Sequence, residues 1–455
     1  MPRSPFIILV ATLALSGCTM NPKYDRPAAP VGAQYPGATQ TNASNAASLG
    51  WETVFTDERL KQLIRLSLTN NANYQVAVLN VEQSRAQYRI TRSASFPSVS
   101  AGGSYTRAGD FTTTSEAWTA SLGSTAYEVD LFGRVRSQNR QALETFFATT
   151  EAQRSAKLSL VAEVATEYFV LRQAEEQIAL AQETLKSVGD SYALNQANFD
   201  AGATSELDLR TAEGQVQTAK INLLTYERAR AQAVNYLVLL IGQGIPTNLP
   251  AASPFNSTNL VAEVSPGLPS ELMQRRPDIL QAEHTLKAAN ANIGAARAAF
   301  FPTISLTANV GSESSQLSEL FSAGTGVWSF APQVTLPIFT GGQNMATLDS
   351  AKISQRIDVV NYQKAIETAF REVADALVAS SSYADQIQVE LKLINAQQRR
   401  YELANLRFRQ GDDSYLNVLS AQQDLYSAQQ ELLQSQFRKL ASQISLYQAL
   451  GGGWK

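Results

Sequence analysis

Residues that could carry catalysis or bind a metal are scarce in this sequence. Among 455 residues there is one cysteine, Cys18, and one histidine, His284. A Cys–His catalytic pair, or a metal site built from several His and Cys ligands, is therefore nearly excluded within one chain. No phosphate-binding loop is present either. We expect no catalytic residue, no metal and no enzyme activity, and we interpret His284 as a surface or packing residue on a helix.

The chemistry open to Cys18 is covalent lipid attachment. The cysteine ends the run Leu15-Ser-Gly-Cys18, which follows an apolar stretch over 6–15 that is too short to span a bilayer. This arrangement resembles the bacterial lipobox, although an ordinary signal peptide with a chance cysteine would look similar. We predict a signal peptide over 1–17, N-palmitoyl and S-diacylglycerol groups on Cys18, no other cofactor, and a lipidated, extended tether over 18–50.

The composition argues against several further classes of protein. The 37 Lys and Arg residues are balanced by 40 Asp and Glu residues, so the net charge is −3 and no basic excess favours nucleic acid as a partner. Charged residues make up only 17%, below the usual ~25%. Four Met residues are too few to favour a Met-lined copper path. After residue 17, no stretch has the ~18 unbroken apolar residues of a membrane-spanning helix.

The sequence that surrounds these residues contains an internal repeat, in which the same kinds of segment occur twice in the same order. The segment 199–207 parallels 408–416 at an offset of 209 residues, and 95–100 parallels 300–305 at an offset of 205. We infer a tandem duplication with two structural repeats. The predicted organisation is a first repeat over 51–250, an equatorial linker over 251–266 and a second repeat over 267–455.

Two long stretches without proline predict long helices. No Pro occurs over 134–245 or over 338–455, and each stretch has one clear turn, at Gly202 and at Gly411. After a preceding helix, each repeat should therefore hold a long helix that spans ~100 Å and a shorter returning helix. The predicted long and returning helices are 133–200 and 205–241 in the first repeat, and 342–409 and 414–450 in the second.

Apolar residues on these helices recur at alternating spacings of three and four. Val161, Val164, Tyr168 and Leu171 follow this spacing in the first repeat, and positions over 370–408 follow it in the second. A sustained period of 3.5 indicates left-handed supercoiling of packed helices. Ser, Ala, Gln and Asn dilute the seam, so we expect coiled packing that is weaker than a leucine zipper. A closed four-helix bundle is the alternative.

Two hairpins with alternating apolar residues precede the long helices. They are predicted over 97–131 and 302–339, with apolar residues on one face and Trp and Tyr near the ends. Alternation over ~10 residues is typical of outer-membrane barrel strands, although a soluble hairpin gives the same pattern. Four strands cannot close a barrel, and lipid does not tolerate an open sheet edge. The chain must therefore oligomerise.

Several longer runs resemble the TolC-like family of outer membrane efflux proteins, in its lipoprotein branch. The most specific run spans 267–302, and 22–27, 129–134 and 336–342 are similar to other segments of the family. The resemblance extends over essentially the whole chain. It implies a mixed α/β membrane protein that forms a homotrimer. Four strands per chain would make a twelve-stranded outer-membrane β-barrel, continuous with a twelve-helix periplasmic α-barrel.

The same resemblance implies a function and partners. The protein would be the outer-membrane exit channel of a tripartite efflux pump, passively conducting drugs or other small molecules, with a role in antibiotic resistance. Its partners would be a periplasmic adaptor (membrane fusion protein), an inner-membrane transporter of the resistance-nodulation-division type and outer-membrane lipids. It would be lipid-anchored in the outer membrane and project into the periplasm. A type I secretion duct and a non-conducting periplasmic coiled-coil lipoprotein scaffold or adaptor stay open as alternatives.

Two sets of residues near the turns are predicted to be functional. In the resembled family, rings of Leu and acidic residues narrow the tunnel at places that match Leu416, Asn417 and Ser420. Because Asn and Ser stand at the acidic places here, Asp208 and Asp424 could supply the negative field instead. The alternative is that Leu416 simply packs between helices. The predicted gate residues that face the lumen are Leu207, Asp208, Thr211, Leu416, Asn417, Ser420 and Asp424. The predicted adaptor-contacting tips, for which simple helix reversals are the alternative, are Gly202, Thr204, Ser205, Gly411, Asp412, Asp413 and Ser414.

Overall fold

The computed structural model describes residues 19–32, 34–35, 50–255, 261 and 269–452. The predicted signal peptide, the predicted lipidation site Cys18, about half of the predicted tether and most of the predicted linker lie outside these described residues. The chain divides into two compact units. The first comprises Met1–Ala29, Leu79–Glu151 and Leu280–Ala365, and the second comprises Pro30–Val78, Ala152–Ile279 and Ile366–Lys455. Among the described helices, none is both long enough and apolar enough to cross a membrane.

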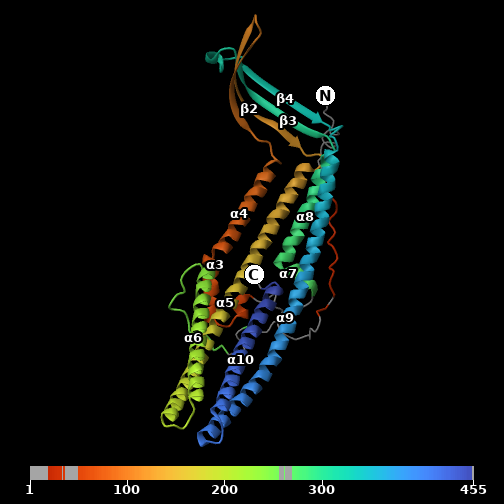
Figure 1. The fold of residues 1–455 in the computed structure, drawn as a ribbon. Helices are drawn as coiled ribbons and strands as arrows, with labels where there is room; N and C mark the ends of the chain where they lie inside the picture. The colour runs from red at the N-terminus through yellow and green to blue at the C-terminus, as the bar shows by residue number, and fades with distance from the viewer. Residues whose placement is uncertain (1–18, 33, 36–49, 256–260, 262–268, 453–455) are drawn as a thin grey trace. The chain divides into compact units, whose positions relative to one another are not determined.

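A four-stranded antiparallel sheet belongs to the first unit (Figure 1). Its order is β1-β2-β3-β4, so the second strand of the first repeat pairs with the first strand of the second repeat. The strands are β1 (Ser100–Gly109), β2 (Thr114–Val129), β3 (Thr303–Ser314) and β4 (Gly326–Thr335). They lie inside the two segments that the sequence predicts to be hairpins.

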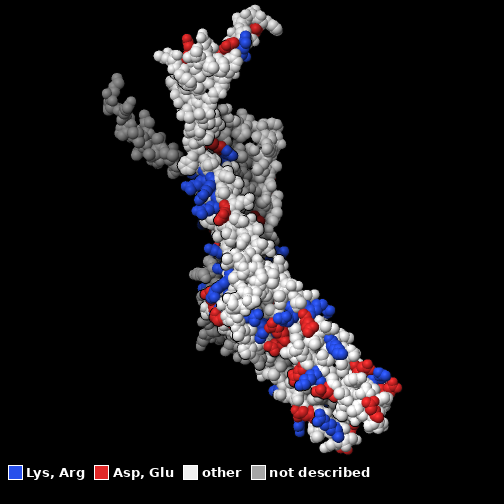
Figure 2. All heavy atoms as spheres, turned by 90° about the vertical axis from the view of Figure 1, so that its left-hand side faces the viewer, with Lys and Arg blue, Asp and Glu red and all other residues white. Residues whose placement is uncertain are grey.

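The register of the sheet gathers the alternating apolar residues on one face. Tyr105 lies opposite Trp118, with ring centroids 4.3 Å apart, and Val310 lies between Leu122 and Trp328 on its two neighbouring strands. Cross-strand partners share a face, so these residues form a continuous apolar surface. Most of it is exposed, and Trp328 is 80% exposed. Figure 2 shows few charged side chains over the strands, which is typical of a sheet that contacts lipid.

A β-bulge keeps the lower part of β2 in phase with this apolar face. The pairing of β2 with β3 shifts between Ser124 and Tyr127. Between them Ala126 has φ +54°, and its N–H donates to the Thr307 hydroxyl at 3.1 Å. One extra residue reverses the alternation of a strand. Tyr127 and Val129 therefore lie opposite β3 residues of the apolar face.

Two long antiparallel helical hairpins follow the strands, and their turns belong to the second unit (Figure 1). The helices are α5 (Arg134–Asp200), α6 (Glu206–Ile241), α9 (Gln343–Gln410) and α10 (Tyr415–Ala449). Each end lies within one residue of the boundary expected from the sequence. The absence of internal proline is the physical reason, since nothing in either stretch removes a helical N–H before the turn.

The single helix expected at the start of each repeat is instead broken. The first repeat has α2 (Trp51–Val54), α3 (Glu58–Asn70) and α4 (Ala72–Ser93), and the second has α7 (Pro269–Arg275) and α8 (Pro277–Ala298). Asn71 has extended ψ, and its side chain accepts from the Tyr74 N–H at 2.9 Å, which caps α4. In the second repeat Pro277 disfavours helical geometry at Arg276 and opens a new helix.

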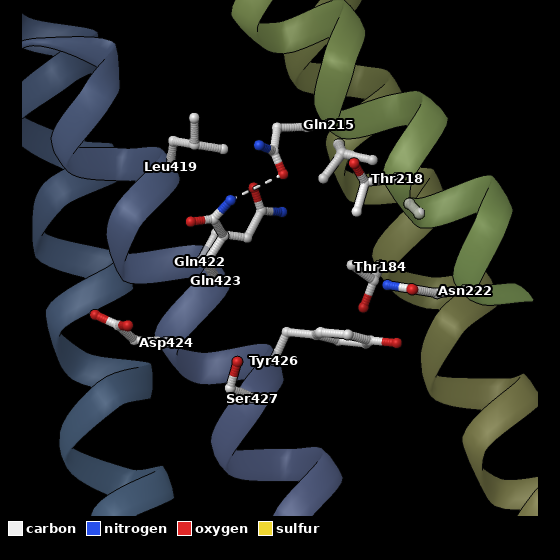
Figure 3. A pocket seen from close by; sticks show the side chains of 12 residues that line it. Thr184, Gln215, Thr218, Asn222, Leu419, Gln422, Gln423, Asp424, Tyr426 and Ser427 are labelled. Carbon is white, nitrogen blue, oxygen red and sulfur yellow. Dashed lines mark hydrogen bonds between the residues drawn. The ribbon is translucent and has the colours of Figure 1, made fainter.

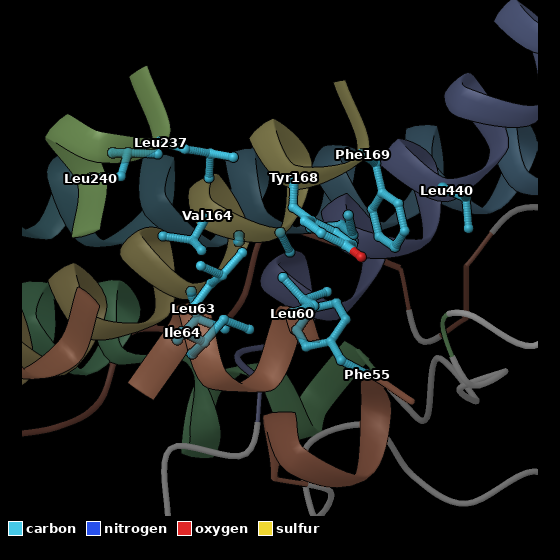
Figure 4. Close-up of a cluster of buried hydrophobic side chains, with 14 of the residues drawn as sticks. Phe55, Leu60, Leu63, Ile64, Val164, Tyr168, Phe169, Leu237, Leu240 and Leu440 are labelled. Atoms are coloured by element: carbon cyan, nitrogen blue, oxygen red, sulfur yellow. The ribbon is translucent and has the colours of Figure 1, made fainter. Parts of the chain in front are cut away.

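The main hydrophobic core lies in the second unit, where α3, α5, α6 and α10 meet (Figure 4). The predicted seam residues Val161, Val164, Tyr168 and Leu171 are all buried there. The Tyr168 hydroxyl donates to Asp57 at 3.0 Å, so the polar end of this large buried side chain is satisfied. The first-repeat seam predicted from the sequence is therefore a true packing face.

The described N-terminal segment over 19–29, here called the strap, is pinned to the first unit. Arg26 pairs with the buried carboxylate of Glu283 at 2.6 Å, and the Tyr24 hydroxyl donates to the same carboxylate at 3.2 Å. The Lys287 ammonium lies 5.3 Å from the Tyr24 ring centroid. The sequence suggests a simple tether here. The strap is extended but docked, because Glu283 is buried and needs cationic partners.

Candidate functional site at the helix tips

The two tip turns have the same backbone geometry. Gly202 and Gly411 have φ of +73° and +80°. The residue after each glycine donates its N–H to the carbonyl five positions earlier, at 2.7 Å and 2.9 Å respectively. This pattern ends a helix with a residue in the left-handed region, which glycine adopts without the steric cost of a Cβ. Both glycines are therefore required by the helix reversal, whatever else the tips contact.

The first returning helix starts with a reciprocal cap. Ser205 accepts from the Asp208 N–H at 3.2 Å, and its hydroxyl donates to the Asp208 carboxylate at 2.6 Å. The Thr204 hydroxyl donates to the same carboxylate at 3.2 Å. The hydrogen bond from Ser205 holds the pKa of Asp208 below its usual range, with Thr204 adding to the effect. Asp208 therefore keeps its negative charge at the place predicted for the gate.

The second tip uses a different set of contacts. Asp413 accepts from the Ser414 N–H at 2.8 Å and from the Asn417 side chain at 2.5 Å, with Arg407 at 3.7 Å. The hydrogen bond from Asn417 holds the pKa of Asp413 below its usual range. The Asn417 side chain is therefore bound to the tip turn, and the negative charge beside it is that of Asp413, one helical turn earlier. Asp412, the other predicted acidic residue of this tip, is exposed.

The two predicted gate leucines are solvent-facing within the chain. Leu207 is 76% exposed and Leu416 is 63% exposed. Their neighbours Tyr415 and Val418 are buried and form an apolar cluster with Ala212 of α6. The hairpins therefore pack at the tips through residues other than the leucines. This arrangement argues against the alternative that Leu416 packs between the helices of one chain.

The predicted polar gate residues of α10 are bound to the neighbouring helix. Arg400 of α9 forms an ion pair with Asp424 and donates to the Ser420 hydroxyl at 3.2 Å. The sequence suggests Asp424 as a source of negative field, whereas the structure places the Arg400 cation directly beside it. Both side chains of the ion pair are about half exposed, so the pair contributes at most about 1 kcal/mol. In the first hairpin, the Thr211 hydroxyl donates to the Leu207 carbonyl of its own helix, at 2.7 Å.

A seam of uncharged polar side chains joins the two hairpins above these turns. Gln423 donates to Gln215 at 3.1 Å, as Figure 3 shows, and Gln422 donates to Ser187 at 3.0 Å. Farther along α5 the seam continues with Gln173 donating to Gln434 at 2.7 Å. A polar hollow of about 300 Å³ lies beside Gln215 and Gln423. Each such bond adds only about 1 kcal/mol net, because water offers similar partners.

Sequence reasoning missed both Arg400 and the polar seam. The seam residues stand out in the sequence only as dilution of the apolar stripe, and no pattern assigns their partners. Arg400 follows Arg399, and the two look alike in the sequence. Arg399 pairs with Glu402 of its own helix at 3.0 Å, whereas Arg400 reaches α10. Only the three-dimensional packing separates the two arginines.

His284 has a packing and ion-pairing environment. Its Nδ1 lies 2.7 Å from the Glu144 carboxylate, which also accepts from Arg140 at 2.6 Å, and its ring contacts Phe147 with centroids 5.3 Å apart. Within the described ranges, no three His, Cys, Asp or Glu side chains gather as metal ligands would.

A sheet with an exposed apolar face and long helical hairpins with polar seams are features of a channel-forming subunit. A family model described as "Outer membrane efflux protein" matches residues 63–243 and 268–452, which is most of the chain. The chain therefore belongs to the outer membrane efflux protein family. Membership places it among channel proteins.

Individual relatives agree with this assignment. The toluene efflux pump outer membrane protein TtgC and the antibiotic efflux pump outer membrane protein ArpC, both of Pseudomonas putida, are each 46% identical over 468 residues, covering 100% of this chain and 96% of the relative. The open state of the Neisseria gonorrhoeae MtrE outer membrane channel has a TM-score of 0.91 at 41% identity, covering 96% of this chain and 99% of that chain. The predicted fold class is confirmed. So is the predicted function as the outer-membrane channel component of an efflux pump.

Proposed function

We propose that three copies of this chain form one duct that carries small organic molecules through the outer membrane. The observation that carries this proposal is the sheet, whose apolar face is exposed and whose edge strands β1 and β4 pair with no further strand among the described residues. Because an open edge cannot face lipid, β1 of one copy should pair with β4 of the next. Three copies supply twelve strands, which exceeds the eight of the smallest barrels.

The polar face of the sheet supports passive conduction. Small uncharged residues face one another across the strands, such as Ser104 opposite Thr119, whose hydroxyls are 2.7 Å apart, and Ser121 opposite Gly311. The same face also carries two carboxylates, Glu313 opposite Thr119 and Glu128 opposite Ser305, and its other paired residues are uncharged. Apart from these carboxylates, the lining imposes little selectivity. The choice of substrate therefore falls to the inner-membrane partner.

The substrates that we infer are apolar or amphiphilic small molecules. The names of the two Pseudomonas putida relatives give toluene and antibiotics. Their similarity over the whole chain supports the same class here. Transport would be driven by an inner-membrane transporter of the resistance-nodulation-division type through a periplasmic adaptor, since the sequence has no nucleotide-binding loop of its own.

The tips are the proposed contact with the adaptor. Ser205, Gly411, Asp412 and Ser414 are exposed at the ends of the two hairpins. Single cysteines at Thr204 and Ser414 should crosslink to the adaptor in cells that express the whole pump. A cysteine at Ser104 in the sheet serves as the control. Crosslinks from the sheet position alone would overturn the assignment.

The lipid on Cys18 remains part of the proposal. The strap supports it, because the Arg297 side chain near the end of α8 donates to the Met20 carbonyl at 3.3 Å. Met20 is thereby held near the end of α8, which leads into β3, and Cys18 precedes it by two residues in the sequence, so a lipid there would suit an anchor in the inner leaflet. Mass spectrometry of the mature N-terminus should find a triacylated cysteine. An unmodified Cys18, or cleavage elsewhere, would exclude the anchor.

Conductance is the direct test of the duct. Purified trimers in planar bilayers should conduct ions, and expression with a cognate adaptor and transporter should restore toluene tolerance to a strain that lacks its own duct. A Cys18→Ser variant with a rescued signal-peptidase site serves as a control, because the barrel by itself should still conduct. Intact trimers without conductance would favour a non-conducting scaffold. Export of protein without solvent tolerance would favour a type I secretion duct.

A further inference from the structure

The two repeats differ at one matched face of the helices that lead into the sheet. The offset of 205 residues that aligns the segments before β1 and β3 also aligns a stripe on α4 with a stripe on α8. The α4 stripe is Arg85, Arg89 and Arg92, and the α8 stripe is Asn290, Gly294 and Arg297. Spacings of four and three put each set on one side of its helix.

The strap covers the stripe on α8. Asn290 donates to the Pro22 carbonyl at 2.9 Å, and Arg297 donates to the Met20 carbonyl at 3.3 Å. Between them, a Cβ on Gly294 would lie 1.7 Å from the Asn21 side-chain oxygen, so a larger residue here would force the Asn21 side chain to move. This face of α8 is therefore a built docking surface for an extended chain.

The matched stripe on α4 is uncovered and cationic. Arg85, Arg89 and Arg92 are all exposed, and in the part of the chain that the structure describes none of them makes a side-chain hydrogen bond or ion pair. Glu82 is the sole acidic residue in the α4 sequence. Three guanidinium groups on one face without a counter-charge call for an anionic partner from outside the described chain.

The position of the stripe identifies that partner. Arg92 is eight residues before Ser100, where β1 begins, and the stripe occupies the last ~12 Å of α4. Figure 2 shows basic side chains gathered just beneath the sheet. Long Arg side chains at this level suit the headgroup layer, in which their stems lie along apolar surface and the charged ends reach phosphates.

We propose that the Arg85, Arg89 and Arg92 face of α4 binds anionic phospholipid headgroups, of the phosphatidylglycerol or cardiolipin type, in the periplasmic leaflet of the outer membrane. The guanidinium fork binds phosphate oxygens with two parallel hydrogen bonds. By repeat symmetry, this face of α4 corresponds to the face of α8 that the strap covers. In the second repeat the helix α8 is thus held by the strap, and in the first repeat the helix α4 would be held by lipid.

Lipid retention tests the proposal on the intact trimer. Trimers are exchanged into discs of equal phosphatidylglycerol and phosphatidylcholine, and the lipids retained after detergent release are counted by native mass spectrometry. Each arginine near a charged surface contributes roughly a fivefold preference. We therefore expect about tenfold or greater enrichment of phosphatidylglycerol for the wild type, and enrichment near one for the Arg85→Gln/Arg89→Gln/Arg92→Gln variant.

A matched variant controls for the loss of three positive charges. Lys220, Arg228 and Arg409 are exposed residues of the other unit, and none of them makes a side-chain ion pair or hydrogen bond among the described residues. Their triple change to Gln should leave the enrichment unchanged. Equal retention of both lipids by the wild type would overturn the proposal, as would enrichment that survives in the α4 variant.

The salt dependence of lipid enrichment in the wild type is a second test. The enrichment should fall severalfold between 50 mM and 500 mM salt, because exposed charge pairs are screened. Enrichment that does not change with salt would contradict an electrostatic site. Cosedimentation with purified peptidoglycan that depends on the α4 arginines, without any lipid preference, would identify a cell-wall polymer as the partner and overturn the lipid proposal.

Discussion

The guanidinium of Arg276 donates a hydrogen bond to the carbonyl oxygen of Ala449 at 2.9 Å, which joins the start of α8 to the end of α10. The first repeat makes the same connection, because the Asn71 side chain donates to the Leu240 carbonyl at 2.9 Å. The donors are 205 residues apart and the acceptors 209, which are the two offsets of the duplicated sequence. In each repeat, one side chain at a helix break satisfies a carbonyl that the returning helix leaves unpaired.

Removing the Arg276 side chain should destabilise the second unit. Arg276 is largely buried and pairs with Asp278 at 2.8 Å as well as with Glu372. Its loss leaves a buried carbonyl and two carboxylates without their cation. We expect Arg276→Ala to cost about 2–3 kcal/mol, because the partners are partly exposed and the full cost of a broken buried pair is larger. Scanning fluorimetry should show a clear fall in Tm.

Arg65→Ala is the control for this change. Arg65 also pairs with a carboxylate, that of Glu52, but both side chains are more than half exposed. A surface pair of this kind contributes about 0–1 kcal/mol. Equal Tm values for the two variants would show that the bond to Ala449 does not hold the junction.

The Arg400 contact with α10 predicts a change in channel opening. Arg400→Ala removes the ion pair with Asp424 and the bond to Ser420, and both connect α9 to α10. The loss of about 1 kcal/mol should raise the open probability in planar bilayers by up to about fivefold. The neighbouring Arg399→Ala is the control, because Arg399 pairs within its own helix. A similar rise for both variants would assign the effect to net charge instead of to the link.

The helices were predictable because their signals are local. Proline-free stretches and single glycines fix the ends of α5, α6, α9 and α10 to within one residue. The bulge at Ala126 was not predictable, since Ala126 has no turn signature and its N–H is satisfied by Thr307, 181 residues away. The strap was not predictable for the same reason. Its acceptor Glu283 looks like an ordinary exposed helix residue in the sequence, and only tertiary packing buries it.

The sequence predicts where the candidate gate residues lie along the helices, but it does not predict the contacts that their side chains make. The repeat placed Leu207 and Leu416 beside the turns, and both are exposed there. The electrostatic field at the predicted gate was harder to predict, because the effect of a carboxylate depends on the nearest cation. For Asp424 that cation is Arg400, which lies 24 residues earlier on the other helix of the hairpin. Sequence spacing gives helix faces and says little about contacts between helices.

The exposed leucines predict a gate that opens when they are truncated. Leu416→Ala should raise single-channel conductance or antibiotic leakage while leaving the stability of the trimer unchanged, because the side chain packs little within its own chain. Val418→Ala is the contrast, since Val418 is buried in the tip cluster and its truncation should cost about 1–3 kcal/mol. If Leu416→Ala lowers trimer stability and leaves conductance alone, Leu416 is a packing residue and the gate lies elsewhere.

The Glu144 carboxylate predicts a loss of stability in acid. Burial by itself raises the pKa of Glu144, but the hydrogen bond from His284 and the charge of Arg140 together hold this pKa below its ordinary value of 4.5. A carboxyl with a lowered folded-state pKa adds stability above about pH 4.5, and this contribution is lost as the pH falls through the folded-state value. The Tm of the wild type should therefore fall more steeply between pH 5 and pH 3 than that of Glu144→Gln. Parallel slopes would show that other groups control the acid transition.

The close approach of the strap to α8 gives the last prediction. Gly294→Ala should loosen the strap, because the added Cβ would lie 1.7 Å from the Asn21 side-chain oxygen and 2.8 Å from the Ser137 hydroxyl and would disturb the hydrogen bond between these two side chains. Trypsin should then cleave after Lys23 at least tenfold faster, because the strap has lost one of its contacts with α8. Arg26 precedes Pro27, and trypsin does not cleave that bond. Gly214→Ala on α6 is the matched control. Its Cβ meets nothing within 4 Å, and a helical Gly to Ala change there should stabilise by up to about 1 kcal/mol. Unchanged cleavage in Gly294→Ala would mean that the strap is held by its ion pair alone, and Glu283→Gln would then have to release it.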